Sequence, residues 1–186
     1  MPLTNCRECR GEVSEEAKAC PRCGVPYPAR ADWDGTGIDW RSQATVFGFP
    51  LVHVAYGRDK RGKHRVARGI IAIGQYGVGL VVIAQFGLGA VTVAQFGIAA
   101  LLGFGQFILA TATVAQFAVG ILFGLGQIAT GYVAIGQFAT GYYAYCMEGF
   151  AKHLWSARTQ DPEAVAFFQR IARFLPWHVG ATPHRG

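Results

Sequence analysis

The segment Gln75-Tyr-Gly-Val-Gly-Leu-Val-Val-Ile-Ala-Gln85-Phe-Gly-Leu-Gly89 contains the repeat on which the fold of this 186-residue chain depends. It lies within residues 69–147, which contain no charged residue. Glutamine recurs there at intervals of 10, 10, 11, 10, 11 and 10 residues, at Gln75, Gln85, Gln95, Gln106, Gln116, Gln127 and Gln137. Self-similarity at a short period indicates a unit that buries its apolar face only by stacking on copies of itself.

The repeating unit is a block of five residues. Residues 70–146 divide into fifteen blocks, thirteen of five residues and two of six, and alternate blocks begin with glutamine. The second and fourth places are mostly bulky, and the fifth is nearly always Gly or Ala. At about 100° per residue, a helix would scatter the glutamines around its circumference, whereas strands joined by corners make them equivalent. The pattern therefore predicts a parallel β-solenoid, with small residues at corners that need tight or positive φ.

Several blocks resemble pentapeptide repeats, in which Ala, then Asp or Asn, then Leu or Phe precede two variable residues. They are Gly74-Gln-Tyr-Gly-Val, Ala84-Gln-Phe-Gly-Leu, Ala94-Gln-Phe-Gly-Ile and Gly136-Gln-Phe-Ala-Thr. The resemblance implies a four-sided right-handed β-helix, although Gln here replaces Asp or Asn. Residues 70–146 more closely resemble uncharacterised bacterial proteins built from Ile-Ala-Ile-Gly pentads, which a segment like Phe49-Pro-Leu-Val-His-Val-Ala-Tyr-Gly-Arg-Asp59 precedes. That resemblance implies no activity.

The number of pentads per coil stays open in the sequence. At about 4.8 Å per coil, residues 70–146 would make about four coils and ~18 Å with four pentads each, or about eight coils and ~37 Å with two. Only the second length would match a hydrocarbon core of about 30 Å. Three or four transmembrane helices are a further alternative, which explains the missing charges but not the regular register.

Four cysteines form the one strong chemical motif, and they are arranged as two Cys-x2-Cys pairs. The candidate metal ligands are Cys6, Cys9, Cys20 and Cys23. Such pairs present four thiolates tetrahedrally to Zn²⁺, and the glycine after each pair would ease a tight turn. Residues 2–28 resemble the short zinc ribbons at bacterial protein N-termini, which implies bound Zn²⁺ in a structural or adaptor role. With every position ligand-occupied, no site remains for water activation. The lone Cys146 is expected to be a small buried hydrophobe.

Charge is concentrated outside the repeat, and the chain carries a net charge of +6. Residues 58–68 form a basic run, for which a solvated hairpin tip, an anchor on anionic lipid and, least favoured, a nucleic-acid contact are the alternatives. The first thirty residues are polar and rich in cysteine, unlike a cleavable signal peptide. We therefore expect a cytoplasmic protein, or an inner-membrane protein with a cytoplasmic N-terminus.

These observations predict a mainly β protein in five segments. They are a zinc ribbon (1–28), a linker (29–44), a β cap (45–69), the β-solenoid (70–146), and C-terminal α-helices with a tail (147–186). Helices are expected at residues 148–157 and 162–175, the second with Asp161 as N-cap and an apolar face toward the core. Short strands are expected at 45–49, 51–56 and 63–67, because an open solenoid end needs a cap.

The sequence offers no catalytic constellation, no small-molecule substrate and no nucleotide-binding loop, so we expect a non-enzymatic structural protein. The glutamines are expected to form a ladder hydrogen-bonded from coil to coil. Bulky second and fourth places cannot all fit inside, so part of the apolar surface must face outward. The interface candidates are Val78, Ile83, Leu88, Val93 and Ile98. They predict either a homo-oligomer or filament, or a repeat embedded in lipid.

Overall fold

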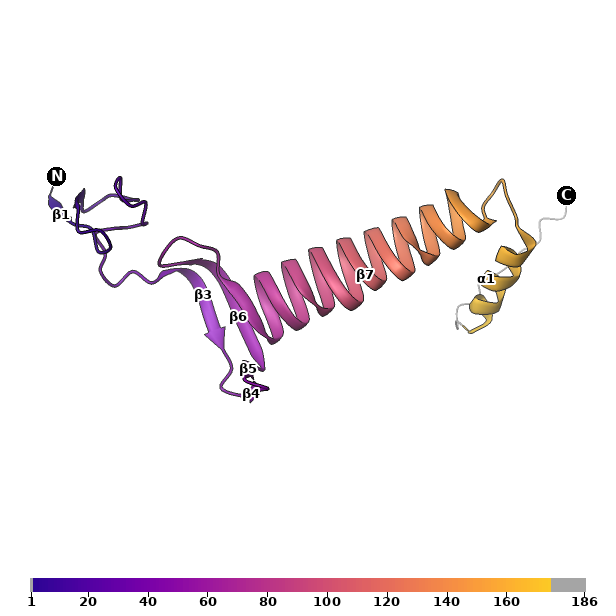
Figure 1. Cartoon of the computed structure of the whole chain (residues 1–186), viewed down its shortest axis with the longest axis horizontal. Coiled ribbons are helices and arrows are strands. Elements are labelled where there is room, and N and C mark those ends of the chain that lie inside the picture. The colour runs from indigo at the N-terminus through magenta and orange to yellow at the C-terminus, as the bar shows by residue number, and fades with distance from the viewer. Residues whose placement is uncertain (1, 175–186) are drawn as a thin grey trace. The chain divides into compact units, whose positions relative to one another are not determined.

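The computed structural model describes residues 2–174 and is mainly β. The chain divides into two compact units, unit 1 (1–100) and unit 2 (101–186), which are described separately. Strand β7 (Val66–Trp155) runs through both, and in each unit its ribbon winds into successive turns (Figure 1). One helix, α1 (Pro162–Phe174), follows within the described residues. No helix in this part of the chain has the length and hydropathy to cross a membrane.

Residues ten apart in β7 lie directly above one another. A Cβ atom added to Gly79 would lie 2.2 Å from the carbonyl oxygen of Gly69, and one added to Gly89 would lie 2.6 Å from that of Gly79. Unit 2 repeats the relationship, because a Cβ on Gly136 would lie 2.3 Å from the carbonyl oxygen of Gly126. Each turn therefore contains two pentads. This is the smaller of the two coil sizes that the sequence leaves open.

The interior of β7 is narrow and is filled by the third residue of each pentad. In unit 1, Ala72, Val82 and Thr92 are fully buried. In unit 2 the buried third-place residues are Ile108, Thr113, Ala118, Ala129, Ala134, Ala139 and Ala144. Small fifth-place residues such as Ala94 and Ala110 are also buried. Because the inward residues are mostly Ala, Gly or Thr, the bulky second and fourth places have no room inside and face outward.

Most of the fifth-place glycines are explained by close approach between turns. Of the two alternatives expected for the corners, tight geometry or positive φ, positive φ is the rare one. Within β7, positive φ is found only at Gly105 and Gly131. Gly79 and Gly89 instead lie so near a carbonyl oxygen of the preceding turn that a side chain would collide with it. The small residue is needed for stacking more than for backbone conformation.

The first turn of β7 is covered by strand β6 (Val52–Asp59), which pairs with it in parallel from Val52↔Ile71 to Ala55↔Gly74. Strand β3 (Gly35–Arg41) pairs antiparallel with the other edge of β6. β3 lies within residues 29–44, for which the sequence predicts a linker. Strands β4 (Thr45–Val46) and β5 (Phe49–Pro50) form a small hairpin, so the single strand predicted at 45–49 is broken by a turn.

The C-terminal segment corrects one helix prediction and supports the other. Residues 148–155 are the last part of β7, because Gly149 stacks against the carbonyl of Ala139 one turn earlier, and this contact overrides local helix propensity. Helix α1 begins where predicted. Its Phe167 ring stacks on Tyr143 with centroids 4.1 Å apart, and Ala164 is fully buried. Of the predicted apolar face, Phe168 is buried, Ile171 is exposed, and residue 175 lies outside the described residues.

Candidate functional site

Two tight turns bring the cysteines of residues 2–28, called here the cysteine region, to one place. Strands β1 (Leu3–Asn5) and β2 (Glu12–Ser14) pair antiparallel around the first turn. The amide of Arg10 donates to the carbonyl of Cys6 (2.9 Å), and the amide of Gly24 donates to that of Cys20 (2.8 Å). Arg10 (φ 57°) and Gly24 (φ 76°) both have left-handed backbone. In the first turn this conformation belongs to Arg10 and not to the following glycine, which corrects the sequence expectation.

The four sulfur atoms have the spacing of a metal tetrathiolate. All lie within 4.8 Å of one another, and the Sγ atoms of Cys6 and Cys23, like those of Cys9 and Cys20, are 3.7 Å apart. A disulfide would bring two sulfurs to about 2.05 Å. Four sulfurs at about 2.3 Å from a central ion in a tetrahedron would be about 3.8 Å apart. The cluster therefore has the donor set and the geometry to bind a metal ion.

The surroundings of the cluster favour the thiolate form at two ligands. The backbone amide of Cys23 lowers the pKa of Cys20 to about 6, against a smaller opposing effect of burial. The amide of Cys9 likewise lowers the pKa of Cys6. Although the amide of Val25 acts to lower it, burial and the neighbouring thiols raise the pKa of Cys23 to about 12. A cluster that shares protons in this way releases them when a cation takes their place.

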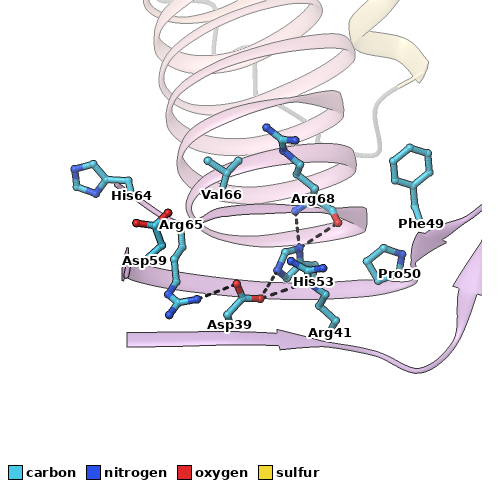
Figure 2. A pocket seen from close by; sticks show the side chains of 10 residues that line it. All are labelled: Asp39, Arg41, Phe49, Pro50, His53, Asp59, His64, Arg65, Val66 and Arg68. Carbon is cyan, nitrogen blue, oxygen red and sulfur yellow. Dashed lines mark hydrogen bonds and ion pairs between the residues drawn. The ribbon is translucent and has the colours of Figure 1, made fainter. Parts of the chain in front are cut away.

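A second polar site lies where β3, β6 and the start of β7 meet, and sequence analysis did not predict it. Asp39, His53 and Arg65 help to line a pocket of about 470 Å³ there. Figure 2 shows the Asp39 carboxylate between Arg65 and His53. The Asp39 carboxylate accepts from Nε2 of buried His53 (3.0 Å) and from Nη1 of Arg65 (3.0 Å). Burial opposes ionisation, but these hydrogen bonds hold the pKa of Asp39 below its usual value.

Both ring nitrogens of His53 are engaged. Nδ1 lies 2.8 Å from the amide nitrogen of Arg68, which donates to it, so the proton sits on Nε2 and points to Asp39. The imidazole has no free nitrogen to take a proton from a substrate. We interpret this network as a brace that ties the antiparallel pair of β3 and β6 to the first turn of β7.

The outward places of β7 are apolar and accessible in unit 1. Val78, Ile83, Leu88, Val93 and Ile98 are between 42% and 53% exposed. The rings of Tyr76, Phe86 and Phe96, ten residues apart, stack with centroids separated by 5.2 and 5.5 Å. The outward side chains therefore form columns of exposed apolar surface along the coil in unit 1.

The repeat glutamines also face outward. Six of the seven are exposed, and Gln75 is half-buried. Among the described residues no coil-to-coil hydrogen bond joins their side chains, so the ladder stays a prediction. Cys146 is buried, with its pKa raised by that burial. It lies in unit 2, while the four clustered cysteines lie in unit 1.

Comparison of the chain with protein-family models, with curated proteins and with solved structures gave no match. The function must therefore be argued from the residues and their geometry.

Proposed function

We propose that this chain is a non-enzymatic structural protein that associates with copies of itself through the apolar outside of a pentad-built β-solenoid. The carrying observation is the exposure of Val78, Ile83, Leu88, Val93 and Ile98, at five-residue intervals within an uncharged segment. Proteins that stay monomeric rarely leave apolar patches of this kind open to water. A second copy offers the same periodic columns, and no charge in residues 69–147 opposes their contact.

Contact through the sides of the coil is favoured over contact through its ends. In unit 1 the first turn of β7 already pairs with β6. In unit 2 the chain folds back on the last turn, because Gln160 forms an antiparallel bridge with Trp155 and the amide of Asp161 donates to the carbonyl of Leu154. End caps of this kind prevent further strands from adding to a solenoid. Growth by lateral packing fits both features.

The cysteine region is proposed as a zinc ribbon that serves as an adaptor. Four thiolates at tetrahedral spacing are the preferred ligand set of structural Zn²⁺, and they leave no open coordination position. Such a site would stabilise residues 2–28, which are too few to form a large hydrophobic core.

Lipid is the alternative environment for the same columns. A coil with ten residues per turn has the length that would match the hydrocarbon core of a bilayer. Its stacked turns satisfy their backbone hydrogen-bonding groups internally. In that setting the protein would be an integral or peripheral membrane protein with its charged segments outside the hydrocarbon.

Two pairs of substitutions test which surface makes the contact. Leu88→Lys with Val93→Lys should convert a large homo-oligomer into small species, because each charge would enter a dry interface. Gln85→Lys with Gln106→Lys adds the same charge at exposed polar places that are not ten residues apart, and should leave the assembly intact. Equal loss of assembly in both variants would show that charge alone, and not the apolar columns, decides association.

A further inference from the structure

Arg7 connects the cysteine region to the rest of unit 1. It lies between the ligands Cys6 and Cys9. Its Nη1 donates to the carbonyl of Trp33 (2.7 Å), and its Nη2 donates to the carbonyls of Pro26 (3.2 Å) and Lys60. The guanidinium also lies 4.9 Å from the centroid of the Trp33 ring. One side chain therefore joins the first cysteine turn, the second cysteine turn and a segment more than fifty residues away.

That distant segment is the turn that connects β6 to β7, called here the basic turn (residues 58–63). Its backbone is held locally, because Oδ1 of Asp59 accepts from the amides of Arg61 and Lys63, each at 2.9 Å. The turn also touches the cysteine region directly. A Cβ on Gly62 would lie 3.3 Å from the ring of Pro26. Its exposed cations are Arg58, Lys60, Arg61 and Lys63.

Charge adds to this contact. A divalent cation held by four thiolates carries two net negative charges. Arg61 lines a pocket of about 320 Å³ together with Cys23 and Glu8, so it lies beside the second cysteine turn. Arg7 is part of the first cysteine turn. Both arginines would be attracted to a loaded centre, and the carbonyl acceptors of Arg7 are correctly placed only while the two cysteine turns stay together.

We propose that metal binding at the four cysteines controls the basic turn: the loaded centre holds the turn against the cysteine region through Arg7 and Arg61, and loss of the metal releases it. The inference rests on the metal site of the proposed function, but it does not depend on self-association. Metal binding would then change how the four cations of the basic turn are presented to a partner of the cysteine region.

Limited proteolysis with trypsin tests this, because the turn contains its own cleavage sites. Cleavage after Lys60 and Arg61 should be about tenfold faster in chelator-stripped full-length protein than in zinc-loaded protein, the factor expected from one hydrogen bond of a charged group. Cleavage after Arg158, exposed in unit 2, serves as the internal control and should keep its rate. Zinc content is measured on each sample.

Variants separate the hold from the metal site. Arg7→Ala should retain zinc yet show the fast cleavage of the stripped protein, and Arg7→Lys should be intermediate because it keeps the charge but not the forked donors. Arg10→Asn removes a cation from the same cysteine turn, suits its left-handed backbone and should change nothing.

Three results would overturn the inference. The first is an equal rate of cleavage in the turn with and without zinc, when zinc content confirms both states. The second is zinc loss from both Arg7 variants, which would assign Arg7 to folding of the cysteine region alone. A protein that binds no zinc at any pH would overturn the metal site itself, and the zinc measurement reports that failure separately.

Discussion

Nε2 of His53 on β6 lies 3.0 Å from Oδ1 of Asp39 on the neighbouring strand β3. The imidazole is almost completely buried, and its other nitrogen accepts the amide of Arg68 at the start of β7. Three segments that enclose the first turn of the coil are thus joined through one side chain. The cap depends on this polar contact as well as on strand pairing.

Asp39→Asn should therefore lower the stability of the protein near neutral pH. It should also make that stability less sensitive to a fall in pH. The folded protein lowers the pKa of Asp39 below 3.8, so its ionised form contributes stability above that pH and loses it as pH falls through the folded value. The difference in thermal midpoint between wild type and Asp39→Asn should shrink below pH 3.8. Asp32→Asn, at an exposed place, is the control. A difference that persists at acid pH would contradict the brace.

Stacking at ten-residue intervals predicts the effect of a single methyl group. Gly79→Ala should destabilise the protein by about 1–3 kcal/mol, because its Cβ would overlap the carbonyl oxygen of Gly69 and force the turns apart. Val78→Ala, next to it but facing outward, should cost much less. Urea unfolding of the two variants measures the difference. Equal midpoints would mean that turns at this point do not stack as described.

The register of glutamines was sufficient to predict strands where hydropathy alone suggests membrane helices. It was not sufficient to say which places face inward. The second and fourth places attract notice because they are bulky, yet the third residue fills the coil. The signal was present in the small third-place residues, Gly77, Gly87 and Ala118 among them, which leave too little space for anything larger inside.

Other misses involve partners distant in sequence. β3 contains Gly35 and Gly37, which are typical of a loop. Gly37 (φ 87°) lies opposite Gly57 (φ 88°), and a Cβ on either would meet the carbonyl of the other strand within 2.2 Å. The two glycines are thus a matched pair within a ladder, which only the partner strand reveals. The pairing of Asp39 with His53 was hidden for the same reason.

Metal retention should depend on pH and on each ligand. Purified protein should contain one zinc per chain and should release it in acid, because protons compete with the metal for the four thiolates. Cys20→Ser should release zinc and unfold residues 2–28 while the β signal of the coil remains. Cys146→Ser is the matched control and should keep the metal. A zinc-sensitive dye measures release, and bound iron with visible absorbance would refute zinc.

The N-cap of α1 should control how firmly the helix packs against the C-terminal part of β7. Oδ1 of Asp161 accepts from the amides of Glu163 (2.8 Å) and Ala164 (3.1 Å). Asp161→Ala should cost about 1 kcal/mol and speed hydrogen exchange at both amides, whereas Asp161→Asn keeps the acceptor and most of the protection. Equal exchange in the two variants would show that packing of Phe167 alone holds the helix.

Sedimentation of the wild-type protein without detergent, over a range of concentrations, tests self-association most directly. The exposed columns from Val78 to Ile98 predict a large homo-oligomer or filament that dissociates little on dilution. Protein that stays in solution only with detergent would favour the lipid alternative. A detergent-free monomer at every concentration would contradict the proposed function in both environments.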